Sequence, residues 1–261
     1  MGERAVLYEA ADRIGMITLN RPDQRNAMTP ELLDAFSVAI GEALADEEIR
    51  CLLITGTGPC FSAGADLRSS LQRSDLGKPA TEASFAMYQP FLQVLEVRVP
   101  VIAAMNGHAV GGGFGLSLLA DIRVANADAK YGANFARLGI HSGLGISYVL
   151  PRLVGPAHAS ELLFTGKLVR GSEALRIGLA THAVDAEEVL PTAMRLSCAV
   201  AGSAPMAVQQ MKASIRRGLR WEIRQAALEE AGLQAASLES EDAKEGIAAI
   251  LEKREPEFTG R

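Results

Sequence analysis

Two glycine-rich segments have the residue types needed to bind a negatively charged oxygen with backbone N–H groups. The first runs from Phe61 to Leu67 (FSAGADL) and the second from Asn106 to Gly115 (NGHAVGGGFG). Each follows an apolar, strand-like run and leads into a helix start, where N–H groups are free and the helix dipole is positive. Small residues also let another molecule approach the backbone. Together the segments predict an oxyanion hole, which suits enolate formation from a thioester or acyl transfer.

The elements that must position these segments alternate between strand and helix, which predicts an α/β fold. Thr29 can cap a helix with Pro30 in its first turn. From about Ala186 the pattern is almost wholly helical, with Ser203 as a further candidate cap, and residues 68–83 are typical of a loop. The expected strands are residues 5–8, 14–19, 51–55, 101–105 and 122–125, and the expected helices are residues 30–45, 84–97, 111–119 and 239–252.

Composition limits the class of protein. The chain has 261 residues, 48% of them hydrophobic, with a net charge of −5 and a mean hydropathy of +0.12. A folded globular protein is expected, with no membrane span and no nucleic-acid partner. Cys51, Cys60 and Cys198 are too scattered for a disulfide framework or a zinc site. The first residues lack the layout of a secretory signal, so a cytoplasmic location is expected.

An ordered series of motifs resembles the crotonase superfamily, that is, the enoyl-CoA hydratase/isomerase family. The matching segments are residues 19–22 (LNRP), 26–28 (NAM), 63–66 (AGAD), 106–113 (NGHAVGGG), 138–140 (LGI), 163–166 (LFTG), 245–246 (EG) and 251–254 (LEKR). The resemblance implies a spiral of β-β-α units over residues 1–200 and a helical oligomerisation region over residues 201–261. It also implies a homo-oligomer, either a trimer or a hexamer.

The resemblance also assigns binding roles, beginning with an acyl-CoA thioester as substrate. The oxyanion donors would be the N–H groups of Ala65 and Gly112, and no metal or tightly bound cofactor is expected. Coenzyme A would lie across the same loops as part of the substrate. For the basic side chains a solvated surface charge is an open alternative, and Asp66 can instead brace its loop. The residues implied to contact coenzyme A are Arg25, Ala27, Ala63, Ala65, Asp66, Arg68 and Lys253.

Two positions depart from the pattern of the family hydratases, which use two glutamates to move protons during hydration. By motif position these glutamates correspond to Gly115 and Phe135. Neither residue can transfer a proton, so the standard hydratase mechanism is not expected. Phe114, Gly115, Phe135 and Leu138 instead predict an apolar acyl pocket, unless Phe135 points into the core.

A different acid or base is therefore needed if the protein is an enzyme. His141 is the first candidate because imidazole titrates near neutral pH; a structural role on the rim of the site is its alternative. Tyr131 and His108 are expected to pack or to brace the backbone, and Glu82 is a remote candidate. His158 and His182 are expected to be structural.

Three functions remain open. The first is an enzyme that forms an enolate of an acyl-CoA, nominally an enoyl-CoA hydratase/isomerase of fatty-acid or related acyl-CoA metabolism. The second is a non-catalytic acyl-CoA binding or shuttle protein that kept the pocket and lost the chemistry. The third is a scaffold subunit without a ligand, which would not bind coenzyme A.

Overall fold

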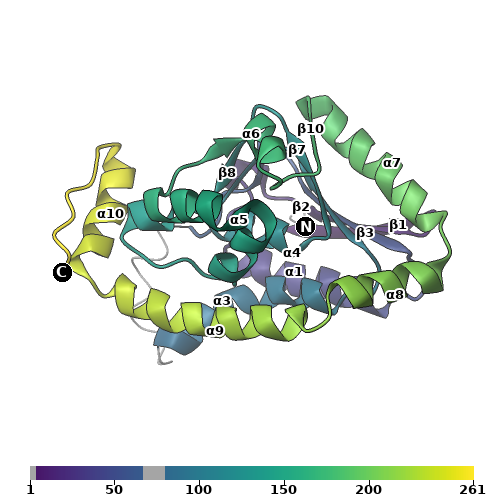
Figure 1. The fold of residues 1–261 in the computed structure, drawn as a ribbon, viewed down its shortest axis with the longest axis horizontal. Helices are drawn as coiled ribbons and strands as arrows, with labels where there is room; N and C mark the ends of the chain where they lie inside the picture. The colour runs from purple at the N-terminus through teal and green to yellow at the C-terminus, as the bar shows by residue number, and fades with distance from the viewer. Residues whose placement is uncertain (1–3, 67–79) are drawn as a thin grey trace.

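The computed structural model describes residues 4–66 and 80–261, and its strands form two sheets (Figure 1). The larger sheet has six strands in the order β1-β2-β3-β5-β7-β10, and the smaller has four in the order β4-β6-β8-β9. The strands are β1 (Val6–Ala11), β2 (Ile14–Leu19), β3 (Cys51–Gly56), β4 (Cys60–Ser62), β5 (Val101–Met105), β6 (His108–Val110), β7 (Ile122–Asn126), β8 (Lys130–Gly132), β9 (Val169–Arg170) and β10 (His182–Val184).

Successive strand pairs divide between the two sheets and are followed by a helix, which gives a spiral. β3, β5 and β7 are parallel neighbours in the larger sheet, while β4, β6 and β8 are parallel neighbours in the smaller one. Each turn of the spiral thus supplies one strand to each sheet. This α/β arrangement confirms the predicted fold class, and it brings the carboxyl ends of β4 and β6 to the same edge.

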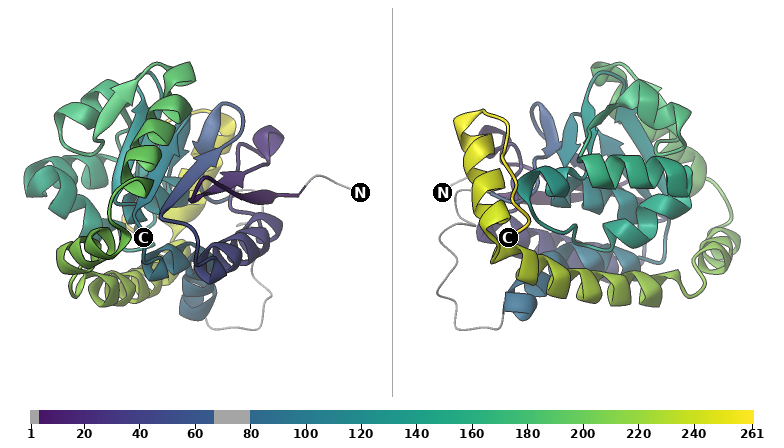
Figure 2. Two further views of the ribbon diagram at one scale, coloured as in Figure 1. Left: turned by 90° about the vertical axis from the view of Figure 1, so that its right-hand side faces the viewer. Right: turned by 60° about the vertical axis from the view of Figure 1, so that its left-hand side comes forward.

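Helices surround the sheets, and the C-terminal ones lie at the periphery of the molecule (Figure 2). α9 packs along α3 and α5, and α10 packs against the 3-10 helix η3 (Asn134–Leu138). The helices are α1 (Pro30–Ala45), α3 (Ala80–Leu92), α4 (Gly112–Leu119), α5 (Ile146–Thr165), α6 (Gly171–Arg176), α7 (Val189–Ala201), α8 (Pro205–Ile215), α9 (Leu219–Leu238) and α10 (Glu241–Glu252). Three further 3-10 helices are η1 (Pro22–Gln24), η2 (Gln93–Glu96) and η4 (Ala186–Glu188).

The core lies on both faces of the larger sheet because its strands are apolar on both sides. In β3, Leu52 and Ile54 face the main core, which α1, α3 and α5 cover. Cys51 and Leu53 point the other way and pack against Val189 and other residues of α7. Alternate side chains of a strand point to opposite faces, so this one strand supports both cores.

Most predicted elements are present, with a few corrections at their ends. The Thr29 hydroxyl accepts a hydrogen bond from the Leu32 N–H at 3.2 Å, as its predicted capping role requires. Ser203 is not a cap, because its hydroxyl donates to the Ala199 carbonyl and α8 begins after Ala204. Residues 80–83 belong to α3, so Glu82 lies in a helix and not in a loop. The rest of the predicted loop, including Arg68, lies outside the described residues.

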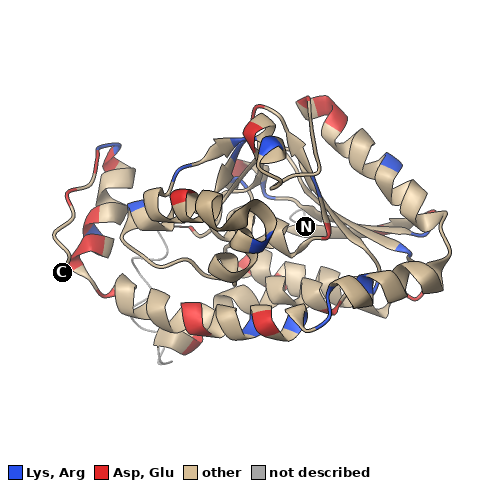
Figure 3. Ribbon diagram, in the orientation of Figure 1, with Lys and Arg blue, Asp and Glu red and all other residues tan. Residues whose placement is uncertain are grey.

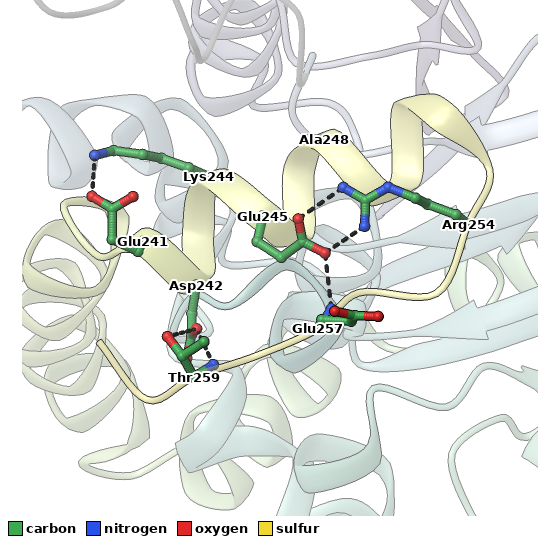
Figure 4. Close-up of a pocket in the computed structure, with 8 residues that line it drawn as sticks. All are labelled: Glu241, Asp242, Lys244, Glu245, Ala248, Arg254, Glu257 and Thr259. Atoms are coloured by element: carbon green, nitrogen blue, oxygen red, sulfur yellow. Dashed lines mark hydrogen bonds and ion pairs between the residues drawn. The ribbon is translucent and has the colours of Figure 1, made fainter.

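The C-terminal chain folds back along α10 and is held there by two carboxylates (Figure 4). Glu245 forms a bidentate ion pair with Arg254 at 2.5 and 2.8 Å and also accepts from the Glu257 N–H. Asp242 accepts from the N–H groups of Thr259 and Gly260 at 2.7 and 2.8 Å. These bonds pull the pKa of the Glu245 carboxyl down to about 2 and lower the pKa of Asp242.

Charges of both signs are interleaved over the visible helices rather than gathered by sign (Figure 3). Among the described residues, no helix is long and apolar enough to cross a membrane.

Candidate active site

The two glycine-rich loops meet because they follow adjacent parallel strands. β4 pairs with β6 through Cys60 with His108 and Ser62 with Ala109, so both chains leave the smaller sheet at one edge. The approach beyond the strands is close. A Cβ atom built on Gly64 would lie 2.6 Å from the Val110 carbonyl oxygen and 3.1 Å from the Gly112 nitrogen. Only glycine fits there, also because its φ is +80°.

The predicted donor groups of the two loops have no acceptor among the described residues. Within residues 4–66 and 80–261, neither the Ala65 N–H nor the Gly112 N–H donates a hydrogen bond to the protein. Gly112 is the first residue of the eight-residue helix α4, where N–H groups have no intrahelical partner. Its neighbour Gly111 has a φ of +56°, and its own N–H donates to the Gly132 carbonyl at 3.0 Å. Gly111 can adopt this turn because glycine tolerates positive φ, and the Gly112 N–H that follows has no acceptor among the described residues.

A buried asparagine holds the first loop in place. The side-chain amide of Asn26 accepts from the Arg21 N–H and donates to the carbonyls of Thr57 and Cys60. The backbone carbonyl of Asn26 accepts from the Ser62 hydroxyl at 2.8 Å. Buried polar groups that are fully bonded in this way fix the backbone around them.

The same segment brings several predicted coenzyme A contacts together. The Ala63 N–H donates to the Arg25 carbonyl at 3.0 Å, and the Met28 N–H donates to the Gly64 carbonyl at 2.8 Å. Arg25, Ala27, Ala63 and Ala65 are therefore neighbours, and Asp66 continues the loop as a half-buried residue. Lys253 is exposed at the end of α10, and no described contact connects it with these loops.

Apolar side chains cover the start of α4. The Met28 thioether occupies the place where a side chain of Gly112 would lie, and the Tyr88 ring is 3.5 Å from the same point. Tyr88 also packs on Gly143, whose added Cβ would lie 2.6 Å from the phenol oxygen. Tyr88 is 2% exposed and shares a hydrogen bond of 3.1 Å with Gln234. The Tyr88 ring thus separates Gly112, in the second of the two glycine-rich loops (the donor loop), from the turn at Gly143.

The space beside Gly115 is filled. A Cβ atom built on Gly115 would lie 2.7 Å from Leu144 Cδ2 and 3.2 Å from Ile146 Cδ1. Any larger residue at position 115 therefore requires the Leu144 side chain to turn away. The predicted apolar character beside Gly115 therefore comes mainly from the side chains of Leu144 and Ile146, for which the glycine leaves room.

The other predicted pocket residues are all buried, and two of them belong to the core. Phe114 is 1% exposed and Phe135 is 7% exposed, and both are part of the main core. The Phe135 ring also faces the donor loop, because Cζ lies 3.7 Å from the Cβ position of Gly111. Leu138 packs on α10, since a Cβ on Gly246 would lie 2.5 Å from its carbonyl carbon. Phe135 is thus a core residue with one edge beside the candidate site.

His141 is held by α9 rather than by the glycine loops. The backbone N–H of His141 donates to the Ser237 hydroxyl at 2.9 Å, and the backbone carbonyl of His141 accepts from the side-chain amide of Gln234 at 3.0 Å. Its ring nitrogen Nδ1 lies 2.8 Å from the Ser142 carbonyl, which favours a proton on Nδ1. Nε2 is then the nitrogen that can accept a proton. Among the described contacts, none joins the imidazole to Ala65 or Gly112.

Tyr131 and His108 both bond to the backbone, as expected for structural roles. Tyr131 is fully buried, and its hydroxyl bonds to the backbone of Met105 and Asn126, while burial raises its pKa. Nδ1 of His108 accepts from the Lys130 N–H at 2.9 Å, which braces β8. No group of three potential metal ligands occurs among the described residues.

Three polar residues around the site were not found from the sequence: Tyr88, Glu230 and Gln234. Their partners are distant in the chain, as with Tyr88 and Gln234, which are 146 positions apart. Helical spacing gives only a weak signal, since Glu230 and Gln234 lie one turn apart on a helix that also has exposed polar residues, Arg220, Glu222, Gln225 and Glu229.

The structure thus defines an α/β spiral protein with a candidate anion site made of backbone N–H groups. The enoyl-CoA hydratase/isomerase family model matches residues 9–261 of the chain. A probable enoyl-CoA hydratase of Mycobacterium leprae is 34% identical over 258 residues, which are 98% of each chain. A crotonyl-CoA hydratase of Syntrophomonas wolfei is 33% identical over 268 residues and 100% of each chain.

Solved structures agree with these sequence relatives. The crystal structure of an enoyl-CoA hydratase/isomerase from Pseudoalteromonas atlantica is 30% identical and has a TM-score of 0.87, covering 98% of this chain and 100% of that one. The chain belongs to the enoyl-CoA hydratase/isomerase family. An enoyl-CoA hydratase-like function at the level of the family, with a CoA thioester as substrate, is consistent with these relatives.

Proposed function

We propose that this protein is an enzyme that binds an acyl-CoA thioester and stabilises its enolate with the N–H groups of Ala65 and Gly112. The observation that carries the proposal is the close approach of two loops in which the N–H groups of Ala65 and Gly112 have no acceptor among the described residues. An enolate develops negative charge on the thioester oxygen, and each preorganised donor contributes about 2.7–4 kcal/mol to lowering such a barrier.

Coenzyme A would bind along the first loop, beside Arg25 and Ala27. The Ala63 N–H donates to the Arg25 carbonyl and the Met28 N–H donates to the Gly64 carbonyl, and these bonds between the two segments support a common surface for the ligand. Asp66, Arg68 and Lys253 belong to the same proposal through family resemblance alone.

The protein would assemble as a trimer or hexamer through residues 201–261. Large apolar side chains on α8 and α9 are exposed in the single chain, among them Met206 (72%), Ile215 (81%) and Trp221 (67%). Exposed apolar residues gathered on neighbouring helices are typical of a contact surface, which supports the oligomerisation role of this region.

Proton transfer would differ from that of a two-glutamate hydratase. Gly115 and Phe135 cannot carry a proton, and they stand where the family resemblance places the two glutamates. His141 is the proposed base, acting through Nε2, since its Nδ1 is turned toward the Ser142 carbonyl. Isomerisation, decarboxylation or retro-Claisen chemistry needs fewer protein carboxylates than hydration does.

The first experiment mixes the pure protein with crotonyl-CoA and with a longer enoyl-CoA. Loss of the conjugated-thioester absorbance measures turnover, and calorimetry on the same samples measures binding. Turnover of either thioester supports an enzyme with an atypical acid–base group. Absence of both binding and turnover across a panel of acyl-CoA thioesters would contradict the proposal.

A second candidate is an acyl-CoA binding or shuttle protein without catalysis. It is favoured by the side chains that surround Gly111–Gly115 in the described structure, because Met28, Tyr88, Phe135 and Leu144 include no carboxylate. It predicts binding without turnover for every thioester tested.

Restoring two glutamates tests this second candidate. The double variant Gly115→Glu/Phe135→Glu is combined with Leu144→Ala, because Leu144 occupies the space at position 115. Hydratase activity in the triple variant supports a simple loss of chemistry. Inactivity with coenzyme A binding retained would count against it.

A further inference from the structure

α9 buries two polar side chains one helical turn apart, against the turn of residues 141–147. Glu230 and Gln234 are each 2% exposed, whereas their neighbours Glu229 and Gln225 are exposed. A buried carboxylate or carboxamide is costly unless it is hydrogen-bonded. Both side chains satisfy this requirement with hydrogen bonds to the turn of residues 141–147.

Glu230 binds the backbone at the start of α5. Oε2 accepts from the Gly145 N–H at 2.6 Å, and Oε1 accepts from the Ser147 N–H and hydroxyl at 2.7 and 2.5 Å. These N–H groups lie in the first turn of α5, which has no acceptor of its own for them. A carboxylate also interacts favourably with the positive end of a helix. Burial nevertheless raises the pKa of Glu230, so its placement has a cost.

Gln234 continues the same contact on the next turn of α9. Its amide donates to the His141 carbonyl at 3.0 Å and shares a hydrogen bond of 3.1 Å with the Tyr88 hydroxyl. The Tyr88 ring in turn lies between Gly143 and Gly112. Gln234 is thus connected to the donor loop through a single aromatic residue.

The turn held by these residues packs against the start of α4. Leu144 and Ile146 fill the space beside Gly115, and Gly143 packs on Tyr88. A shift of the turn would change the room available next to Gly112 without changing the donors themselves. Because packed interiors transmit small displacements, a shift of this turn would move Leu144 and Tyr88, the side chains beside Gly115 and Gly112.

We propose that Glu230 and Gln234 are positioning residues that hold the turn of residues 141–147 against α4 and so determine which acyl groups the site accepts. The inference rests on the proposed acyl-CoA function. Neither residue is a catalytic group, since each acts through the backbone of the turn or through Tyr88. A branched or bulky acyl group needs more room beside Gly112 than a short straight one.

The test compares Glu230→Gln with Glu229→Gln. Both changes remove one negative charge from α9, but only the first disturbs the turn. Glutamine has a single acceptor oxygen, so its NH2 group would face an N–H of Gly145 or Ser147. Calorimetry gives Kd for butanoyl-CoA and for a bulky phenylacetyl-CoA, and hydrogen exchange follows the amides of residues 143–147.

For Glu230→Gln we expect exchange of these amides to rise by roughly tenfold or more, because the turn opens more often. We also expect the ratio of the two Kd values to change by about tenfold in favour of the bulky thioester. Glu229→Gln should leave both quantities at the wild-type value. The milder variant Ser147→Ala removes one of the three bonds and should give a smaller change in the same direction if Glu230→Gln fails to fold.

Two results would overturn the inference. An unchanged Kd ratio together with a lower melting temperature would show that Glu230 only stabilises the fold. Gln234→Leu with the same selectivity as its exposed control Gln225→Leu would show that the second contact has no effect on the site. Absence of any thioester binding by the wild type would instead overturn the proposed function, and the selectivity claim with it.

Discussion

The two sides of the candidate site are built differently. The donor side consists of backbone from the loops after β4 and β6, and strand register and glycine conformation fix its geometry. The facing side consists of side chains from η3 and the turn of residues 141–147, and hydrogen bonds from α9 hold it. The first side is made of neighbours in the spiral, whereas the second is held by hydrogen bonds to residues up to 96 positions away.

This difference separates what the two sides can change. Backbone donors are tied to the fold, so altering them means altering the spiral itself. The facing side can change its side chains while the loops stay intact. In this chain the facing side is apolar, because Phe135, Leu144 and Ile146 contribute its side chains next to the glycines.

The largest effect is expected from disturbing the donor side. Gly64→Ala places a methyl group 2.6 Å from the Val110 carbonyl oxygen, at a φ of +80°, and so pushes the two loops apart. Turnover should fall by about 100- to 1,000-fold, the usual effect of losing one oxyanion donor. Steady-state kinetics on the best thioester, with circular dichroism to confirm folding, measures the effect.

The control for this change is Gly41→Ala on α1, where an added methyl group meets nothing within 4 Å. It should leave turnover unchanged. Ala65→Pro provides a second test because it removes the donor hydrogen itself. Wild-type turnover in both Gly64→Ala and Ala65→Pro would break the comparison, because the donor side would then be dispensable.

A smaller loss is expected on the facing side. If His141 is the base, His141→Ala should lower kcat by about 100-fold with little change in Kd for the thioester. His158→Ala on α5 is the matched control and should keep full activity. Equal activity of the two variants would remove His141 from the mechanism and leave the donor side without an identified proton-transfer partner.

Changing an apolar side chain of the facing side should alter the selectivity between acyl groups rather than the rate of turnover. Phe135→Leu shortens the side chain whose ring lies 3.7 Å from the Cβ position of Gly111. We expect kcat/KM for bulky over short thioesters to rise by roughly tenfold. Phe164→Leu changes a side chain that is 79% exposed and should have no effect. An unchanged ratio in Phe135→Leu would place the ring in the core alone.

The smallest effect concerns the C-terminal tail, which lies behind the facing side. The pKa of Glu245 is lowered from 4.5 to about 2 by Arg254 and the Glu257 N–H. A lowered carboxyl pKa means that the contact stabilises the fold above pH 4.5 and is lost as the pH falls toward 2. Hydrogen exchange of residues 255–261 should therefore remain slow at pH 3.5.

Glu245→Gln should raise that exchange at pH 3.5 and at pH 7, since it removes the ion pair with Arg254. Glu241→Gln, which breaks only the exposed pair with Lys244, is the control. Equal exchange in the two variants would show that Arg254 does not hold the tail.

Much of the donor side could be predicted from the sequence because its signals are local. Glycines after apolar runs identified both loops, and Thr29 with Pro30 identified the start of α1. The prediction for Ser203 was wrong because a serine hydroxyl can bond backward, here to the Ala199 carbonyl, as well as forward to cap the next helix. Such competing hydrogen bonds decide at which residue a helix begins, and the local sequence does not show which of them forms.

The facing side could not be predicted, for a physical reason. Nothing near Glu230 in the sequence indicates that its carboxylate accepts the N–H of Gly145, 85 positions away. Tyr88 likewise shows no local sign of packing on Gly143. These contacts arise only when α3 and α9 pack against the turn of residues 141–147, so a single sequence predicts the donors better than the residues that face them.

The most direct test of the central claim is infrared spectroscopy of an acyl-CoA with a ¹³C-labelled thioester carbonyl, bound to the protein. Two N–H groups converging on the carbonyl oxygen polarise the C=O bond. The account predicts that the labelled stretch moves to lower frequency on binding and that Gly64→Ala reduces this shift. A bound thioester whose carbonyl frequency stays at its value in water would contradict it, whatever the protein's turnover.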